Sequence, residues 1–582
     1  MREPLQRLLM PSFLLALCIG SGCTSASDEA MPLLAPSVVV PAAGQEIEDT
    51  DAVLWADSVL AALSVDEKIG QLFIVHLLSQ DIPIILQGGM PESVAAHHAG
   101  GFLISRILPP GEVFAVARRV QQRTNVPLFI AADYERGVGR YANPLTELPS
   151  NMALGATRDT ALAEEAGRLT AIEAKAIGVN LLFAPVVDVN NNPDNPIINT
   201  RSYGEDPALV GAMAAAFVRG AQTEGVATTL KHFPGHGNTA VDSHNRMGTV
   251  PGSYADLQAT ELAPYRDVFS GPAAPEAVMT AHLWIPALDD EAIPATLSRN
   301  VLGVLRDSLG YDGVIVTDDI KMGGLSNTYP LADRIRMALD ASVDIILTPK
   351  SMATAADIVK DLLADGSLTE TRLDESVRRV LLAKAHANLH RNAVPSRAAF
   401  DARMAQPLGE PTAQAIADAA LTQIGSHPAL ALADGVRVAL LQLTNYRNST
   451  SIGVAMDTLA AYLNPVTDLR LATETPSEGE SRRLMEAAAD ADVVVLTLYQ
   501  RLRSGRGRAG LTEGQTRLAQ RLTALDVPVV LVAFGNPYVL ADVPGADVSL
   551  VAYDQTVASV RAVLDALDGT LVPSGQLPIT VE

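Results

Sequence analysis

Residues 313–319 read Gly-Val-Ile-Val-Thr-Asp-Asp, a short apolar run that passes directly into two carboxylates. The run has no polar alternation, which is typical of a parallel strand buried on both faces. Polar groups at the carboxyl end of such a strand often lie in a functional site, so Asp318 and Asp319 are candidates. Successive strand side chains alternate in direction, so we expect one carboxylate to project inward and the other to bond the loop.

Seven similar runs share the first part of the chain, at residues 69–75, 101–105, 127–133, 180–189, 227–232, 277–282 and 344–348. Helical patterns lie between them, at residues 110–124, 160–176, 207–224 and 331–341. Short strands alternating with helices predict an α/β fold, here a TIM-like (β/α)8 barrel over residues 51–391. The strand count alone also leaves an open doubly wound sheet as an alternative.

A second α/β pattern follows a predicted linker at residues 392–413. Its apolar runs are residues 436–443, 493–498, 529–534 and 548–552, with helical patterns at 481–489, 513–524 and 556–567. Strands joined by crossover helices predict a small parallel sheet, so residues 414–582 are expected to form a smaller α/β sandwich domain. We expect this domain to support the barrel rather than to supply chemistry.

The first 50 residues have the pattern of an export signal and a tether. A positive start and a short apolar core at residues 8–19 precede Cys23. The small residues before Cys23 resemble the lipobox of bacterial lipoproteins, although Gly20 stands where that motif usually has Leu, so ordinary cleavage stays open. We expect a signal peptide at residues 1–23, lipidation of Cys23, a flexible tether at residues 24–50, and an extracytoplasmic, membrane-anchored protein, periplasmic or on the cell surface.

The formal net charge of −23 disfavours nucleic acid and anionic membranes as partners. Both cysteines, Cys18 and Cys23, lie in the signal-like segment, so the mature fold is expected to have no disulfide and no thiolate chemistry. The low lysine content fits both a high-salt habitat and a genomic composition bias.

The densest group of polar residues follows the run at 227–232. Residues 231–237 read Lys-His-Phe-Pro-Gly-His-Gly, and Asp242-Ser243-His244 comes five residues later. Histidines and an aspartate suggest a metal site, but the spacing fits no helical pair of ligands and no cysteine is near, so we expect no metal. An Asp two positions before a His can instead fix the imidazole tautomer and raise its basicity, giving a general acid/base. The other interpretation is that these residues only stabilise the loop.

Further polar residues are expected on the same rim of the barrel. Asp133 ends the run at 127–133 and Glu135 follows it, which makes Glu135 the first alternative acid. Arg201 follows the fourth run. Nearby cations favour the ionised form of a carboxylate, so we expect Lys231 and Arg201 to keep Asp318 ionised.

These segments together resemble glycoside hydrolase family 3, in its bacterial β-N-acetylglucosaminidase branch. The resemblance rests on residues 231–237 with Asp242-Ser243-His244, and on residues 183–189, 201–204, 279–282 and 314–318. It begins at about Trp55 and continues weakly into residues 530–537 and 573–578. The family's β-glucosidases take their acid/base from a Glu of the second domain and lack the Asp-Ser-His combination.

Position by position, the resemblance implies that Asp318 is the nucleophile and that Asp242 and His244 form the acid/base pair. The residues it implies for binding the terminal sugar are Asp133, Arg140, Arg201, Lys231 and His232. This chain departs from the branch at residues 135–140, which read Glu-Arg-Gly-Val-Gly-Arg where the branch has a Gly-Gly-Arg pattern. Arg140 is therefore the nearest counterpart of the branch's sugar-binding arginine.

The implied activity is exo-acting and retaining: release of terminal β-linked N-acetylglucosamine (GlcNAc) from peptidoglycan fragments or chitin oligomers through a glycosyl-enzyme on Asp318. The expected partner is carbohydrate, and neither a metal nor an organic cofactor is needed. Phosphorolysis and family 3 β-glucosidase activity are the alternative reactions. The alternative from another class is a non-enzymatic sugar-binding lipoprotein, which intact Asp318, Asp242 and His244 disfavour.

Overall fold

The computed structural model describes residues 50–272, 274–406, 409–425, 432–433, 435–444, 449–500 and 510–581. The predicted signal peptide, Cys23 and the tether up to residue 49 lie outside the described residues. Helix α1 (Thr50–Ala62) begins at the end of that predicted tether. None of the described helices is both long and apolar enough to cross a membrane.

The larger sheet of the described chain is an eight-stranded parallel barrel. Its strands, in spatial order, are β10 (Ile346–Leu347), β1 (Phe73–His76), β2 (Gly101–Leu103), β3 (Phe129–Ala132), β4 (Leu181–Leu182), β5 (Ala227–Phe233), β7 (Ala277–Thr280) and β9 (Val314–Thr317). A bridge between Val316 and Ile345 joins β9 to the residue before β10 and closes the ring. Each of the eight predicted runs overlaps one of these strands, so the barrel is confirmed and the open sheet is excluded.

Most of the barrel strands are shorter than their apolar runs, and two of them show why. Residues 69–71 belong to helix α2 (Val65–Gln71), whose first turn is fixed by a capping box between Ser64 and Glu67. Only Leu181 and Leu182 of the run at 180–189 pair as strand β4, and the rest of that run turns over the rim with its side chains buried. An apolar run indicates that its residues are buried, but it does not show that they form a strand. The residues of a helix end or of a packed loop can be buried in the same way.

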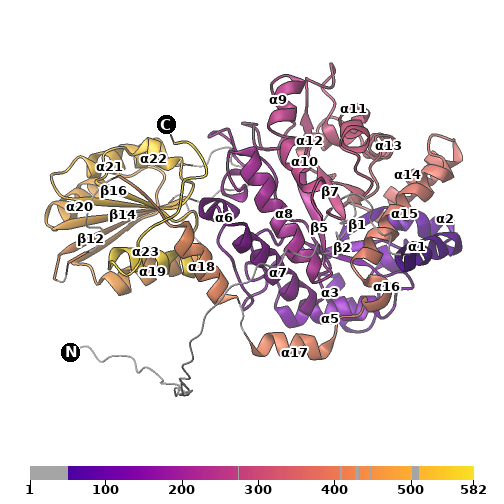
Figure 1. Ribbon diagram of the computed structural model, residues 1–582, viewed down its shortest axis with the longest axis horizontal. Coiled ribbons are helices and arrows are strands. Elements are labelled where there is room, and N and C mark those ends of the chain that lie inside the picture. Colours follow the sequence, from indigo (N-terminus) through magenta and orange to yellow (C-terminus); the bar gives the residue numbers. More distant parts are fainter. Residues whose placement is uncertain are drawn as a thin grey trace, which may run out of the picture. The chain divides into compact units, whose positions relative to one another are not determined.

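Helices surround the barrel (Figure 1). The longer ones are α5 (Pro110–Gln121), α7 (Thr160–Ile177), α8 (Pro207–Thr223), α13 (Leu331–Asp340), α14 (Met352–Ala364) and α15 (Glu370–His386). Shorter elements between the barrel strands are α3 (Asp81–Leu86), α4 (Glu92–Ala95), α6 (Asn151–Thr157), η1 (Asn199–Arg201), β6 (Gly248–Thr249), α9 (Tyr254–Ala259), α10 (Ala263–Phe269), β8 (Leu283–Trp284), η2 (Ala295–Leu297), α11 (Arg299–Gly303), η3 (Val304–Ser308) and α12 (Gly323–Ser326).

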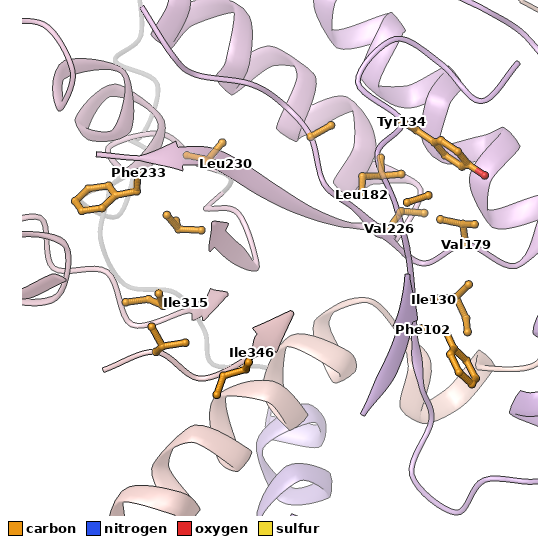
Figure 2. Close-up of a cluster of buried hydrophobic side chains, with 14 of the residues drawn as sticks. Phe102, Ile130, Tyr134, Val179, Leu182, Val226, Leu230, Phe233, Ile315 and Ile346 are labelled. Carbon is orange, nitrogen blue, oxygen red and sulfur yellow. The ribbon is translucent and has the colours of Figure 1, made fainter. Parts of the chain in front are cut away.

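Alternation along the barrel strands divides the core into two clusters. Phe102, Ile130 and Leu182 belong to a cluster that also contains buried residues of the surrounding helices (Figure 2). Their strand neighbours Leu103, Phe129 and Leu181 belong to a separate cluster. Since successive strand side chains point to opposite faces, this division is what a barrel packed on both its inner and outer faces requires.

The described residues of the second domain form a six-stranded sheet between two helical layers. Its strand order is β11 (Thr422–Ile424), β16 (Val548–Val551), β15 (Val529–Gly535), β14 (Val493–Gln500), β12 (Val438–Thr444) and β13 (Thr467–Leu471). One face packs on α19 (Thr450–Leu463) and α23 (Val557–Leu567), and the other on α20 (Glu478–Ala489), α21 (Glu513–Thr523) and α22 (Val539–Asp542). The α/β sandwich is confirmed.

Two strands of this sheet were not predicted, and helices occupy much of the predicted linker. Strand β11 has three residues and is the antiparallel member, and β13 lies at the opposite edge with alternate residues exposed. Neither resembles the continuous apolar run of a central strand. Helices α16 (Leu389–Asn392), α17 (Arg397–Ala405) and α18 (Glu410–Ala420) lead from the barrel to β11.

Candidate active site

A cavity of about 460 Å³ lies at the carboxyl ends of the barrel strands. Seven of the eight predicted site residues line it: Asp133, Arg140, Arg201, Lys231, His232, His244 and Asp318. The eighth, Asp242, bonds His244. Loops that follow β3, β4, β5 and β9 therefore bring the predicted residues into one site, as the topology of a parallel barrel requires.

Asp242 and His244 form a hydrogen-bonded pair on the loop after β5. His244 Nδ1 lies 2.8 Å from Oδ1 of Asp242, and the backbone N–H of His244 donates to the same oxygen at 2.9 Å. An ionised carboxylate only accepts, so Nδ1 carries the proton and Nε2 is the atom available to act. The Asp242 side chain is 3% exposed, whereas that of His244 is 44% exposed.

The surroundings of His244 raise its pKa above the ordinary value of 6.5. Burial alone lowers the pKa, but the hydrogen bond that the ring donates to Asp242 and the charges of Asp318 and Asp242 outweigh it. The imidazole can therefore hold a proton near neutral pH and later take one back, as a general acid/base must.

Asp318 follows β9, and its surroundings keep it ionised. Burial raises its pKa, but the charges of His232, His282 and His244 bring the pKa below its usual value. Its Oδ1 accepts from the backbone N–H of Asp319 at 2.7 Å. Lys231 and Arg201, which were expected to hold Asp318 ionised, pair with other carboxylates and are not among the largest causes of its lowered pKa.

Asp319 also lines the cavity but is bonded to the loops around it. It lies 3.5 Å from Nε2 of His76 and 3.2 Å from Nζ of Lys321, and it accepts from the backbone N–H of Lys321. Burial raises its pKa, but the hydrogen bonds from His76 and Lys321 outweigh this and lower the pKa to about 2.

Lys231 and Arg201 converge on Glu135. Arg201 donates to both carboxylate oxygens, at 3.0 and 2.8 Å, and Lys231 Nζ lies 2.7 Å from Oε1. Lys231 also donates to Asp133 at 2.9 Å. Burial raises the pKa of Glu135, but Arg201 and Lys231 hold the pKa well below its usual range. Glu135 is therefore ionised at neutral pH, which disfavours it as the alternative acid.

His232 is oriented by a buried carboxylate that sequence reasoning did not single out. Nδ1 of His232 lies 2.7 Å from Oδ2 of Asp188, and its Nε2 lies 3.5 Å from Arg201 Nη2. Asp188 ends the apolar stretch after β4, as Asp133 and Asp318 end those of β3 and β9. The same position relative to its strand could have identified it.

His236 serves the loop. Its backbone N–H donates to Asp188 at 2.7 Å, and its Nε2 lies 2.8 Å from Oγ of Ser243. Burial lowers its pKa to about 4, so the ring is neutral. The loop-stabilising interpretation therefore holds for this histidine. Across the described part of the chain, no three His, Cys, Asp or Glu side chains are grouped to hold a metal ion.

The second domain also lines the cavity, through Gln500, Gly535, Tyr553, Asp554 and Gln555. Gln500 and Gly535 are the last residues of β14 and β15, and the other three follow β16. Asp554 accepts from the backbone N–H of Ser150 at 2.6 Å. Sequence reasoning missed all five, although functional groups gather at the carboxyl ends of parallel strands in an open sheet as in a barrel.

An ionised carboxylate near a carboxylate-bound histidine, beside side chains that can bind hydroxyls, defines a barrel enzyme of the glycosidase type. Residues 64–383 match the family model described as glycosyl hydrolase family 3 N terminal domain, and residues 323–582 match that of the family's C-terminal domain. The chain belongs to glycosyl hydrolase family 3 and is a glycoside hydrolase.

One curated relative covers nearly the whole chain, and another covers about two thirds of it. A beta-N-acetylglucosaminidase/beta-glucosidase from Cellulomonas fimi is 29% identical over 552 residues, 91% of this chain and 96% of that protein. Beta-hexosaminidase LpqI from Mycobacterium tuberculosis is 33% identical over 377 residues, 63% of this chain and 91% of that protein.

Two solved structures also resemble the chain closely. The family 3 β-N-acetylglucosaminidase from Paenibacillus sp. str. FPU-7 has a TM-score of 0.77 and 30% identity, and the match covers 89% of this chain and 99% of that one. The β-glucoside phosphorylase BglX has a TM-score of 0.80 and 27% identity, over 91% of this chain and 96% of that one.

Proposed function

We propose that this enzyme is an exo-acting, retaining β-N-acetylglucosaminidase that releases terminal β-linked GlcNAc. The observation that carries the proposal is the Asp242–His244 pair beside ionised Asp318. Relatives named for this activity and for β-hexosaminidase activity support the substrate class. Peptidoglycan fragments and chitin oligomers both carry such a terminal sugar and are the proposed natural substrates.

In the first step an Asp318 oxygen attacks the anomeric carbon, and the bond from that carbon to the leaving oxygen breaks. Nε2 of His244 gives its proton to the leaving oxygen, so the aglycone departs as a neutral alcohol. In the second step a water oxygen attacks the same carbon while His244 takes a water proton. The ester bond to Asp318 breaks, and two displacements leave the configuration unchanged.

The decisive experiment compares aryl β-GlcNAc with the matching aryl β-glucoside. We expect a higher kcat/KM for the GlcNAc glycoside and, by NMR, the β anomer as the first sugar released. Purified Asp318→Ala protein is the control for contaminating activity. A preference for the glucoside would place the chain with β-glucosidases, and an α anomer as first product would exclude retention.

Phosphorolysis is the second candidate reaction. A neutral imidazole repels phosphate less than a carboxylate acid/base does, and one close structural neighbour is named a phosphorylase. The two reactions share the glycosyl-enzyme and differ in whether water or phosphate accepts the sugar. Incubation with inorganic phosphate separates them, since phosphorolysis yields a sugar 1-phosphate. We expect free GlcNAc.

The proposed location is extracytoplasmic, through a lipid on Cys23. The small residues before this cysteine and the apolar core at residues 8–19 support it. Replacing Cys23 with Ser should release the enzyme from the membrane fraction, because one sulfur carries the anchor. Fractionation with an activity assay checks this. Wild-type enzyme in the soluble fraction, or a variant that stays on the membrane, would exclude the anchor.

A further inference from the structure

Gln500, at the end of β14, is a buried amide with no partner. It is 4% exposed, it lines the cavity, and neither Oε1 nor Nε2 has a hydrogen-bond partner in the described structure. Folded proteins pair nearly all buried polar groups, since an unmade hydrogen bond costs folding free energy. An amide offers two donors and an acceptor, a set that suits sugar hydroxyls. A side chain of this kind is suited to a partner that arrives with the substrate.

A second buried polar group without a partner among the described residues lines the same cavity. Asn151, at the start of α6, is buried and lines the cavity, and its Oδ1 has no partner among the described residues. Its Nδ2 donates to the backbone carbonyl of Arg201 at 2.7 Å, which fixes the amide beside that arginine. Two buried amides from different domains thus offer unused polar atoms to one cavity.

Hydrogen bonds connect the cavity-lining part of the second domain to the barrel loops that follow β3 and β4. Gln500 pairs in register with Gly535 on the neighbouring strand. The next residue, Asn536, accepts from Nδ2 of Asn199 at 3.0 Å, and Asn199 opens the short helix that ends at Arg201. Gln500 therefore lies on the Arg201 side of the cavity.

The reacting groups lie on the other side. Asp318 follows β9, which is separated from β4 by β5 and β7 in the ring and bridges to the residue before β10. The loop of His244 reaches the same side, since the backbone N–H of Gly323, just past β9, donates to the His244 carbonyl at 2.9 Å. A sugar whose anomeric carbon meets Asp318 turns its opposite ring edge, with the 4-hydroxyl, toward Arg201 and Gln500.

We infer that Gln500, together with Asn151, binds the 4-hydroxyl of the terminal sugar and so determines specificity from the second domain. The inference rests on the proposed function for the position of the anomeric carbon. It also gives exo-action a physical cause, because a wall that bonds the 4-hydroxyl leaves no room for a further sugar attached there. The second domain thus contributes to recognition while the barrel supplies the reacting groups.

Gln500→Leu tests this without loss of fold. Replacing an unpaired buried amide by an apolar group of similar size is near neutral or stabilising, so we expect an unchanged or raised Tm. Asn151 is a poorer probe because it also holds Arg201. The matched control is Thr497→Val, a buried residue of the same strand whose side chain points to the opposite face of the sheet and does not line the cavity.

The assay uses a nitrophenyl β-GlcNAc glycoside and its 4-deoxy analogue, which have the same leaving group. For the parent, Gln500→Leu should lower kcat/KM about ten- to a hundredfold. For the 4-deoxy analogue we expect wild type and variant to be nearly equal, because the contact is already missing. Thr497→Val should match wild type on both substrates.

Three results would overturn the inference. The first is an equal loss of kcat/KM on both glycosides, and the second is no loss on either. The third is a loss of kcat/KM confined to disaccharides, which would place Gln500 against the aglycone. Failure of the proposed function is a separate result. If the wild type prefers β-glucosides, the same comparison is made with a nitrophenyl β-glucoside and its 4-deoxy analogue, and the same outcomes decide.

Discussion

Asp318→Ala should lower turnover by about four orders of magnitude or more while the protein stays folded. Removing a group that forms the covalent intermediate abolishes the route that depends on it, and losses of this size are typical of such residues. Within the described part of the chain, the side chain bonds only the neighbouring backbone N–H of Asp319, so its removal leaves the core intact. Steady-state kinetics and a thermal melt measure the two effects.

The neighbouring carboxylate is the matched control. Asp319 lines the same cavity but pairs with His76 and Lys321, so Asp319→Ala should loosen the loop and reduce turnover far less than Asp318→Ala. A fluorinated sugar trap with peptide mass spectrometry should place the label on Asp318. Label on Asp319 would reverse the two roles, and absence of label would indicate that the substrate's acetamido group attacks in place of the carboxylate.

The sequence predicts the barrel well because every residue of a typical barrel strand is apolar, so each position indicates the same buried strand. Runs such as residues 127–133 are apolar throughout, and burial on both faces allows little else. The edge strand β13 was not predicted, for the opposite reason. Alternate residues of this strand face solvent, so its sequence resembles that of a loop. Prediction thus succeeds where the core dictates residue type and fails at edges, where it does not.

For the site, position along the chain predicts proximity but not pairing. Functional residues of a parallel barrel lie at the carboxyl ends of its strands, which predicts that Asp133, Lys231 and Asp318 share one rim. In the structure they line one cavity. Which cation faces which carboxylate depends on side-chain reach, and here Lys231 and Arg201 bond Glu135 rather than Asp318. The position of Gln500 beside the cavity depends on how the second domain packs on the barrel, and no local sequence pattern predicts that packing.

The second prediction concerns the acid/base pair, and it depends on the leaving group. A sugar alkoxide needs a proton to depart, whereas a nitrophenolate leaves almost unaided. His244→Ala should therefore cut kcat/KM for a GlcNAc disaccharide about a hundredfold to ten-thousandfold and that for the nitrophenyl glycoside much less. With the activated substrate, hydrolysis of the glycosyl-enzyme should become limiting and give a burst. Added azide should partly restore this step, because azide needs no base.

The pH dependence provides an independent readout of the same pair. His244 must be protonated for the first step, so kcat/KM should fall as pH rises through its pKa, which lies above 6.5. Asp242→Asn keeps a group of the same shape but removes a charge that raises this pKa, so the alkaline limb should move to lower pH. In His244→Ala the limb should vanish for the nitrophenyl glycoside.

Equal losses on good and poor leaving groups would contradict the role of His244 as acid and leave it a binding or loop-supporting residue. Glu135 would not replace it, because Arg201 and Lys231 keep that carboxyl ionised. Asp319, with a pKa of about 2, has no proton to give either. Apart from the nucleophile Asp318, the other carboxylates that line the cavity are Asp133, which accepts from Lys231, and Asp554, which accepts from Ser150. His244 is thus the cavity group whose raised pKa and exposed ring together suit proton transfer to a leaving oxygen.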